Sequence, residues 1–504
     1  MFRPLLCGLA LFLAAPLAAQ QAPQQAGAPI TPADMMRHIQ VLASDDYQGR
    51  APGTEGERLT INYIAEQFAA RGLEPAGENG TWFQPVRLVE RTPVSATVRW
   101  TANGADIPFD AANIHLTAGE ASAAVADAPV VFVGYGVRAP DHGVDQLAGV
   151  DLRGAVALIL ADGPPVPGFP PLAERTRNVL EAGASAVIVI LGATLDFPRI
   201  KARWSRPRTM LDSAPAVPLG GFMPAPALQT LAAAAGGEFA RTLSEPPGPG
   251  FRAVALPLRV SLEATSRVQR FNSNNVVGRL RGSGSTGESV VFLGHWDHFG
   301  LCRPEGEADR ICNGAVDNAS GIAMMIEVAG RLAAGPRPAR DILFLATTAE
   351  EDGLLGATYF AAHPTVPLAS IAVAVNMDTV ALHPAGSPVA VMGRGLPPLD
   401  AVIDASVAAM GRRLDPDNEA AELIERQDGW AFTQAGVPTI MIGGSFSDMG
   451  LVNAFFAGRY HKPSDQADGE MVLTGAAEDA NLTVELARRL ADPAQYQRPA
   501  RSGE

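Results

Sequence analysis

Seven side chains that can bind a metal or carry a proton follow apolar runs or lie in short loops of this sequence. They are His295, Asp297, Asp317, Glu350, Glu351, Asp378 and His461. Each has an ordinary explanation when taken singly; Asp317, for example, suits a helix N-cap. Taken together they would leave several uncompensated carboxylates at one edge of a sheet, which is costly. The set therefore predicts a cluster of cations at that edge.

The ligand types favour zinc. Two histidines with several carboxylates match zinc by ligand type and by number. Two metals about 3.5–4 Å apart would need a carboxylate that bridges them. Asp297 lies two residues after His295. On a continuing strand it would share the histidine's face and could orient the imidazole.

After Asn274, short apolar runs alternate with helical stretches, and these elements must position the candidate residues. A helix is expected at 321–335, where apolar residues recur on one face. Such alternation predicts an α/β fold with a mixed, mostly parallel sheet covered by helices on both faces. In open sheets of this class, ligands bind beyond the carboxyl ends of the strands. The expected strands are 289–295, 341–348, 371–378 and 437–443.

Two helices at 32–43 and 55–72 are expected to open the mature chain, each with a threonine N-cap. Residues 92–264 differ from the rest of the chain in their sequence pattern, because short apolar runs and proline-rich loops dominate them. We expect this segment to form an inserted, β-rich α/β domain without catalytic residues. Its expected strands are 130–137, 155–161 and 186–191, with a helix at 176–184.

One histidine of the insertion could suggest a metal site. His142 stands beside Asp141 and Asp145, but no further ligand lies at a useful spacing. A solvated loop is the favoured interpretation.

The first 19 residues resemble a secretory signal. Arg3 is followed by an apolar core from Leu5 to Leu17 and then by small residues. The apolar core is short for a membrane-spanning anchor, and Cys7 lies too early for a lipoprotein cleavage site. The sequence therefore predicts export to the periplasm or the extracellular space, without a stable membrane anchor.

Export affects the interpretation of the two remaining cysteines. Cys302 and Cys312 flank the hydrophilic stretch RPEGEADRI. In an oxidising compartment two nearby cysteines are expected to form a disulfide. Free thiols are the alternative, and thiolate ligation of a metal is disfavoured by the spacing.

The composition limits the classes of partner that the protein is expected to bind. The chain has 504 residues, of which 47% are hydrophobic and 18% charged, and its formal net charge is -14. The apolar content predicts a packed globular protein. The acidic balance argues against nucleic acid or an anionic membrane as the main partner.

Five motifs in their order resemble those of the co-catalytic zinc exopeptidases. They are GHWDHFG, GAVDNASG, TTAEEDGLLG, VNMDTV and YHKPSD. That family includes bacterial leucyl aminopeptidase, aminopeptidase Y and glutamate carboxypeptidase-like enzymes. The resemblance covers 31–91 and 265–492 and leaves 493–504 as a tail. Within 92–264, VVFVGYGVRAP and GVDLRGAVALILADG resemble the protease-associated domain that is often inserted in such enzymes.

The resemblance implies two zinc ions per chain and a peptide substrate. One zinc would be held by His295 and Asp378. The other would be held by Glu351 and His461, and Asp317 would bridge the two metals.

The resemblance also assigns the remaining carboxylates. Glu350 matches the general base of the family, and Asp297 matches an aspartate that supports a zinc ligand. The segment RQDGWAFTQAGVP resembles a pocket segment that usually reads SDH, but Gln427 and Gly429 replace the serine and the histidine. This departure concerns the choice of substrate and leaves the metal residues intact.

The sequence therefore predicts a secreted dizinc exopeptidase, foremost an aminopeptidase. The metals would polarise the scissile carbonyl and lower the pKa of a bridging water, while Glu350 would move that water's proton to the leaving amine. A carboxypeptidase or dipeptidase on the same metal pair is the main alternative. A glutaminyl-cyclase-like transferase and an inactive receptor-like binding module are further alternatives. The complete set of ligands argues against both of these.

Overall fold

The computed structural model describes residues 27–139, 144–164, 168–192, 194–236, 247–248 and 250–499. The predicted signal segment 1–19 and His142 lie outside these ranges. Within the described part, no helix combines the length and the apolar character needed to cross a membrane.

A mixed sheet forms the centre of the first lobe. Four of its strands, β19, β17, β13 and β16, are parallel, and β18 pairs antiparallel at the edge. The predicted α/β class is therefore confirmed, and each of the four expected strands is present. In sheet order the strands are β18 (Ala390–Met392), β19 (Thr439–Gly443), β17 (Ile371–Asn376), β13 (Ser289–His295) and β16 (Asp341–Thr347).

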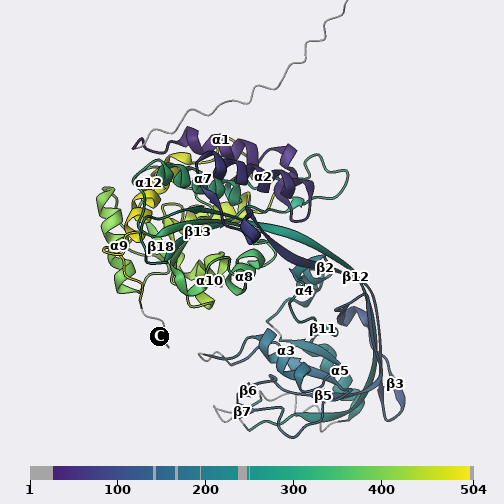
Figure 1. Ribbon diagram of the computed structural model, residues 1–504. Coiled ribbons are helices and arrows are strands. Elements are labelled where there is room, and N and C mark those ends of the chain that lie inside the picture. The colour runs from purple at the N-terminus through teal and green to yellow at the C-terminus, as the bar shows by residue number, and fades with distance from the viewer. Residues whose placement is uncertain are drawn as a thin grey trace, which may run out of the picture.

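Helices cover both faces of this sheet, as Figure 1 shows. Helices α8 (Leu355–Ala362) and α10 (Gly429–Gln434) cover one face. The threonine caps expected for the first two helices are present at Thr31 and Thr54. The opposite face carries α1 (Pro32–Leu42), α2 (Glu55–Ala70), α7 (Ser320–Ala333) and α12 (Leu473–Leu490).

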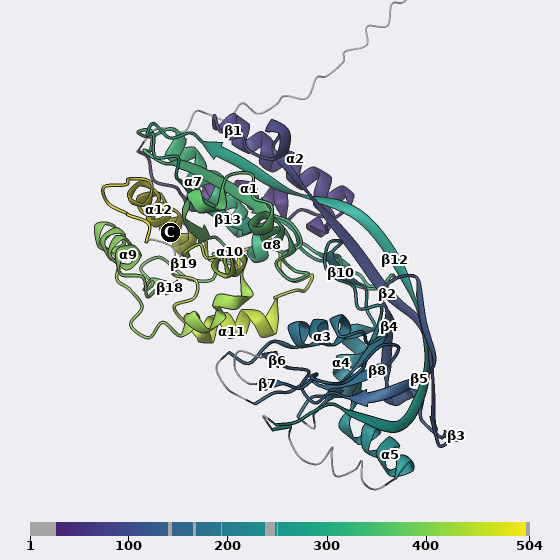
Figure 2. The ribbon, with the colours of Figure 1, turned by 60° about the horizontal axis from the view of Figure 1, so that its bottom comes forward.

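Two very long strands connect the first lobe with the second. Strand β2 (Phe83–Ala102) pairs antiparallel with β12 (Val254–Leu280) along almost its whole length, with a register shift between Thr265 and Ser266. Figure 2 shows this curved ribbon reaching from one lobe to the other. The expected boundaries of the insertion, at 92 and 264, fall inside these strands. The transition between lobes is therefore a continuous hydrogen-bonded ribbon.

The second lobe contains the insertion and has apolar cores of its own. Strand β5 (Ser122–Phe132) stops five residues before the end of the expected 130–137 strand. Gly134 and Gly136 follow it with positive φ, so the extended run cannot continue there. The lobe's other main elements are β8 (Val156–Leu160), β9 (Ala186–Leu191), β11 (Leu219–Pro224), β4 (His115–Ala118), α3 (Leu172–Glu181) and α5 (Ala225–Ala235).

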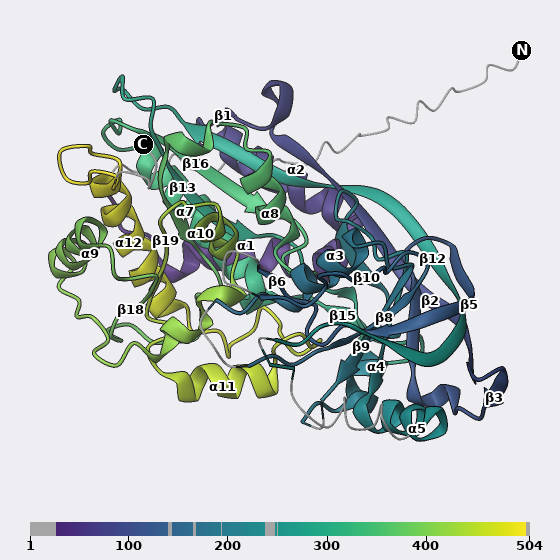
Figure 3. The same cartoon turned by 90° about the horizontal axis from the view of Figure 1, so that it is seen from below.

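The inserted lobe also packs against the first lobe through a short strand. Strand β10 (Arg208–Leu211) pairs with β2 and contacts α8, and Figure 3 shows it next to the long strands β2 and β12. Leu211 joins Leu355 and Tyr359 of the first lobe in one apolar cluster around the buried Ala349. The insertion is therefore anchored immediately behind the loop that carries Glu350.

Candidate metal centre

The structure gathers the predicted residues at the carboxyl ends of three parallel strands. His295 is the last residue of β13, Glu350 and Glu351 follow β16, and Asp378 follows β17. Two further segments complete the cluster. Asp317 lies in the buried turn Ala315–Ala319 before α7, and His461 follows α11 (Met449–Gly458).

Asp317 occupies the middle of the cluster. Its Oδ1 lies 3.2 Å from Nε2 of His295, and its Oδ2 lies 3.3 Å from Nε2 of His461. The two oxygens of one carboxylate thus face two different imidazoles. A carboxylate shared between two cations needs this arrangement.

A further carboxylate accompanies each histidine. Asp378 Oδ1 lies 3.5 Å from His295 Nε2, and Glu351 Oε2 lies 3.1 Å from His461 Nε2. The residues therefore form two half-sites, each with one imidazole and one carboxylate of its own, on either side of Asp317. His461 is the most exposed of the five side chains, at 33%, so the cluster is open on its side.

The chemistry of these donors fits zinc. His295 Nδ1 lies 3.1 Å from the carbonyl oxygen of Asp297. That contact assigns the ring proton to Nδ1 and leaves the Nε2 lone pair facing the cluster. Asp317 Oδ2 and His461 Nε2 are buried and make no hydrogen bond, which is unusual for polar atoms unless an ion binds them. His295, Asp317 and Glu351 offer ligand atoms within 4.8 Å of one another.

The hydrogen bonds of the Asp297 carboxylate go to the backbone of the two glutamates. Its carboxylate Oδ1 is 3.9 Å from His295 Nδ1, too far for a hydrogen bond, and the backbone carbonyl orients the ring instead. The carboxylate accepts the backbone N–H groups of Glu350, at 3.1 Å, and Glu351, at 3.4 Å. The expectation required the strand to continue past His295, but β13 ends there. Asp297 therefore positions the two glutamates.

Burial and the neighbouring charged groups shift the pKa values of side chains in the cluster. Burial alone lowers the pKa of His461, but contacts with Asp317 and Glu351 raise it to about 9. Burial raises the pKa of Glu350 well above its usual value; Glu351 adds to this effect and His295 opposes it. A cation between the histidines would relieve this crowding of carboxylates.

His298 belongs to the cluster but was not among the predicted residues. Its Nδ1 lies 2.5 Å from Glu351 Oε1, opposite the side on which Glu351 faces His461, and its side chain is fully buried. The ring therefore fixes the orientation of the Glu351 carboxylate. The available signal was the second histidine of GHWDHFG, which the sequence interpretation left without a role.

Two buried charged residues hold the loop that carries Asp317. Asp465 accepts the backbone N–H of Asp317 at 3.1 Å and that of Val316 at 3.0 Å. Arg50 donates to the carbonyl oxygens of Asn313 and Gly314 on the same loop, at 2.5 and 2.9 Å. Burial lowers the pKa of Arg50 to about 10, so it remains charged at neutral pH.

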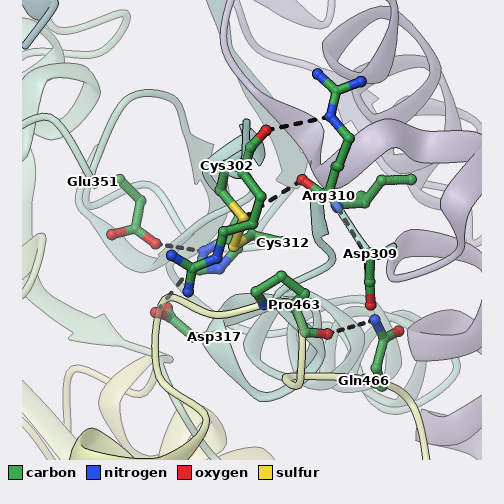
Figure 4. The surroundings of a disulfide bond; sticks show 11 residues. Cys302, Asp309, Arg310, Cys312, Asp317, Glu351, Pro463 and Gln466 are labelled. Atoms are coloured by element: carbon green, nitrogen blue, oxygen red, sulfur yellow. Dashed lines mark hydrogen bonds and ion pairs between the residues drawn. A yellow bond between two sulfur atoms is a disulfide. The ribbon is translucent and has the colours of Figure 1, made fainter. Parts of the chain in front are cut away.

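The predicted disulfide is confirmed. Cys302 and Cys312 are bonded, with their Cα atoms 5.7 Å apart. The bond lies beside a short hairpin of β14 (Gly300–Leu301) and β15 (Ile311–Cys312) that leads into the Asp317 loop. Figure 4 shows the disulfide next to Asp317 and Glu351.

A pocket adjoins the candidate metal residues and is lined by both polar and apolar side chains. Asp317, Glu350 and Asp378 form its polar end. Gln427, one of the two residues that depart from the SDH pattern, lines the wall, and its Oε1 accepts the N–H of Gly429 at 2.8 Å. The rest of the lining comprises Thr379, Met392, Leu423, Arg426, Met441, Phe446, Phe456 and Tyr460.

Comparison with known proteins agrees with this geometry. The model of Peptidase family M28 matches residues 275–484. A "Probable zinc metalloprotease" of Pyrenophora teres f. teres is 35% identical over 109 residues, which is 22% of this chain and 23% of that protein. Aminopeptidase NAALADL1 of Rattus norvegicus is 29% identical over 165 residues, 31% of this chain and 20% of that protein. The chain thus matches less than a quarter of the length of either relative.

Among solved structures, the aminopeptidase from Aneurinibacillus sp. strain AM-1 superposes with a TM-score of 0.56. The alignment covers 95% of this chain and 99% of that chain at 18% identity. At this level of identity the comparison supports a common fold that extends over both lobes.

Proposed function

We propose that this chain, whose residues 275–484 belong to Peptidase family M28, is a zinc-dependent exopeptidase that removes N-terminal residues from peptides. One observation carries the proposal. Asp317 directs its two oxygens at His295 and His461, and each histidine has a carboxylate of its own. This arrangement provides ligands for two zinc ions with one shared carboxylate.

Five residues would hold the metals. His295 and Asp378 would hold one, His461 and Glu351 the other, and Asp317 both. When bound, zinc acts as a Lewis acid and lowers the pKa of a coordinated water towards neutrality.

Glu350 is the residue that would move the proton. Its side chain lines the pocket beside Asp317 and Asp378, while its backbone N–H is held by Asp297. Its Oε2 lies 3.9 Å from His295 Nε2, so it is close to the cluster without duplicating the contacts of Asp378. A base in this position can accept a proton from the attacking water and return it to the leaving amine.

Tyr460 would assist at the carbonyl oxygen of the substrate. It lines the same pocket and stacks on His461. Burial and the neighbouring carboxylates raise the pKa of its hydroxyl, so the hydroxyl remains a hydrogen-bond donor at neutral pH. A donor at this place stabilises negative charge that develops on the carbonyl oxygen.

The surplus of negative charge favours a free amine at the polar end of the pocket. Asp378 and Glu350 line that end, and Asp428 is buried close enough to both to influence Glu350. An α-ammonium group is attracted to such carboxylates, and the matched rat relative is itself named an aminopeptidase. The apolar side chains of the lining, among them Met441 and Phe446, would contact the side chain of the N-terminal residue.

One observation favours a second candidate, a carboxypeptidase or dipeptidase. Arg426 lines the pocket and lies over the ring of Phe456 at 5.0 Å. Across the described residues no ion pair engages it. A guanidinium in this position could bind the terminal carboxylate of a short peptide.

End-blocked dipeptides separate these candidates. Zinc-loaded protein would be assayed with Leu-Ala, acetyl-Leu-Ala and Leu-Ala-amide. An aminopeptidase cleaves the first and third and spares the acetylated peptide. A carboxypeptidase spares the amide, and a dipeptidase needs both free ends. Cleavage of acetyl-Leu-Ala at a rate equal to that of Leu-Ala would refute the aminopeptidase proposal.

Export from the cytoplasm is also part of the proposal. The disulfide supports it, because such bonds persist chiefly in oxidising compartments. Mass spectrometry of the protein recovered from the periplasm or medium should show an N-terminus close to residue 20. An intact Met1 on the recovered protein would contradict export by signal cleavage.

A further inference from the structure

The inserted lobe carries a concentrated positive charge on a chain whose net charge is -14. The stretch PRIKARWSRPR, residues 198–208, contains five cationic residues and no carboxylate. It covers most of α4 (Phe197–Trp204) and the start of β10. The side chains form a surface that we name the α4 basic patch, defined by Arg199, Arg203, Arg206 and Arg208.

The patch is not neutralised within the chain. Arg199, Arg203 and Arg206 are exposed. In the part of the chain that the structure describes, no ion pair engages any of the four arginines. By contrast, three other exposed arginines of the lobe each pair with an aspartate, at 2.6–2.8 Å: Arg99 with Asp106, Arg153 with Asp151 and Arg259 with Asp127.

The patch reaches the loop that carries Glu350 and Glu351. Thr209, the next residue after Arg208, hydrogen-bonds Asp352, and Asp352 directly follows Glu351. Arg208 interacts electrostatically with Asp352 on one side and with Arg203 on the other. Leu211 of the same strand packs with Leu355. The patch thus adjoins the segment that directly follows Glu351, and Figure 1 shows α4 at the end of the inserted lobe nearest the first lobe.

One arginine of the patch is held in place. The guanidinium of Arg208 lies 3.6 Å from the centre of the Trp204 ring, and Trp204 rests edge-on against Phe222 of β11. Trp204 is itself 39% exposed. A stacked guanidinium loses less conformational freedom when it binds a carboxylate, and its planar fork suits such a partner.

We infer that the α4 basic patch binds acidic side chains of the peptide substrate on the carboxyl-terminal side of the scissile bond, and so selects acidic peptides. This preference presupposes the exopeptidase activity proposed above. A peptide whose first residue occupies the pocket extends out of the site, and a patch beside the loop that follows Glu351 can reach residues further along. Among the nearby carboxylates, Asp352 interacts electrostatically with Arg208 and with Glu90, and Asp196 caps α4 by accepting the backbone N–H of Arg199. Across the described residues, none of these carboxylates forms an ion pair with an arginine of the patch.

The test compares two variants of equal charge. In R203Q/R206Q/R208Q three of the four arginines of the patch lose their charge, and Arg199 remains. In the control R99Q/R153Q/R259Q three arginines are removed from the same lobe but from ion pairs away from α4. Both are assayed as zinc-loaded full chains with Leu-Ala-Ala-Glu-Glu, Leu-Ala-Ala-Gln-Gln and Leu-Ala-Ala-Lys-Lys.

We expect the unmodified protein and the control to prefer the Glu peptide in kcat/KM. The patch variant should lose about tenfold on that peptide, a difference typical of lost charge complementarity, and should retain its rate on the Gln peptide. Salt of about 0.5 M should reduce the preference of the unmodified protein, because it screens exposed charges. Equal rates on the three peptides, or equal losses on all of them in the patch variant, would overturn the inference.

A binding measurement separates this inference from the proposed function. The Glu350→Gln protein is titrated with Leu-Ala-Ala-Glu-Glu while tryptophan fluorescence is followed, since Trp204 lies within the patch. Saturable binding that R203Q/R206Q/R208Q weakens and the control retains would support the patch even if no peptide were cleaved. Binding to phosphatidylglycerol vesicles with no response to the acidic peptide would overturn the inference and assign the patch to a membrane surface.

Discussion

Glu350 and Glu351 are neighbours in the chain, yet their carboxylates approach different histidines. Glu351 Oε2 lies 3.1 Å from His461 Nε2, whereas Glu350 Oε2 lies 3.9 Å from His295 Nε2. Asp297 accepts the backbone N–H of both. One aspartate therefore fixes the backbone of the pair, and the side chains diverge from it into the two halves of the cluster.

The divergence predicts that the two glutamates can be separated by mutation. Glu350→Gln keeps the shape of the side chain and removes its basicity. We expect zinc content to be unchanged and kcat to fall by about 10²- to 10⁴-fold, the usual contribution of a general base. Glu351→Ala should instead lose one zinc equivalent. Elemental analysis and steady-state kinetics on the same samples provide both readouts, with the exposed Glu55→Gln as a control. A Glu350→Gln protein that loses zinc or retains turnover would contradict this division of roles.

The second prediction concerns metal content. The shared position of Asp317 leads us to expect two zinc ions per chain after dialysis, and loss of both in Asp317→Ala. Because bound metal stabilises the folded state by mass action, a chelator should lower the melting temperature. That decrease should be much smaller in Asp317→Ala. A single zinc equivalent in carefully reloaded protein would argue for a mononuclear site.

The sequence was sufficient to predict the sheet class and to identify five side chains that the structure brings together, while their role as metal ligands stays a prediction. Polar residues stood directly after apolar runs, and parallel strands bring their carboxyl ends to one edge. His295 and Asp378 follow this rule closely. Asp297 also lies at this edge, but its expected face depended on a strand that stops at His295, and its carboxylate is 3.9 Å from His295 Nδ1.

Other features had no local signal. Arg50 contacts carbonyl oxygens of loops more than 240 residues away in the chain, and any residue type can supply a carbonyl. The sequence also carries no local signal for the limits of the insertion, because β2 and β12 continue through residues 92 and 264 as one paired ribbon. Pairing over such a separation is a tertiary property, and composition alone does not reveal it.

The third prediction concerns the disulfide. Cys302→Ser together with Cys312→Ser should lower stability by about 2–3 kcal/mol, the value expected for closing a short loop. The effect should extend to catalysis, because Cys312 directly precedes the Asn313–Gly314 carbonyls that Arg50 holds. Thermal unfolding measures the loss of stability, and a comparison of KM between the unmodified protein and the double variant measures the effect on catalysis. Unreduced peptide mapping should show the Cys302–Cys312 link, and alkylation of both thiols in exported protein would contradict it.

The fourth prediction is a pH dependence of stability at a site away from the metal residues. His38 is buried, with Nδ1 2.7 Å from the Tyr63 hydroxyl and Nε2 3.0 Å from Glu327 Oε1. Burial lowers the pKa of His38 below 6.5, with Glu327 opposing and Arg71 reinforcing the effect. Unfolded chains then bind a proton that the folded protein does not, so stability falls as pH drops below about 6.5.

Replacing this histidine removes its part of the pH dependence. The difference in melting temperature between the unmodified protein and His38→Gln should be largest near pH 8 and shrink towards about pH 5. The exposed His363→Gln serves as the control, and its difference should vary less with pH. A difference for His38→Gln that stays constant across this range would show that folding leaves the pKa of His38 unchanged, and a difference that grows towards pH 5 would show that folding raises it.

The last prediction concerns Arg50, whose guanidinium joins three segments. Besides Asn313 and Gly314, it donates to the carbonyl oxygens of Leu42 and Trp296, at 2.7 and 2.8 Å. Lysine in its place keeps the charge but has no planar fork, so it cannot satisfy all these carbonyls at once. Buried acceptors left without partners cost about 1–3 kcal/mol each.

Arg50→Lys should therefore be less stable, and it should bind zinc about 10–100-fold more weakly, because it loosens the loop that carries Asp317. Competition with a fluorescent zinc chelator measures the affinity, and thermal unfolding measures the stability. The exposed Arg58→Lys on α2 is the matched control and should change neither. If Arg50→Lys lost stability but kept full zinc affinity, Arg50 would support the fold without positioning Asp317. Unchanged stability and unchanged zinc affinity would show that the hydrogen bonds of the Arg50 guanidinium are dispensable.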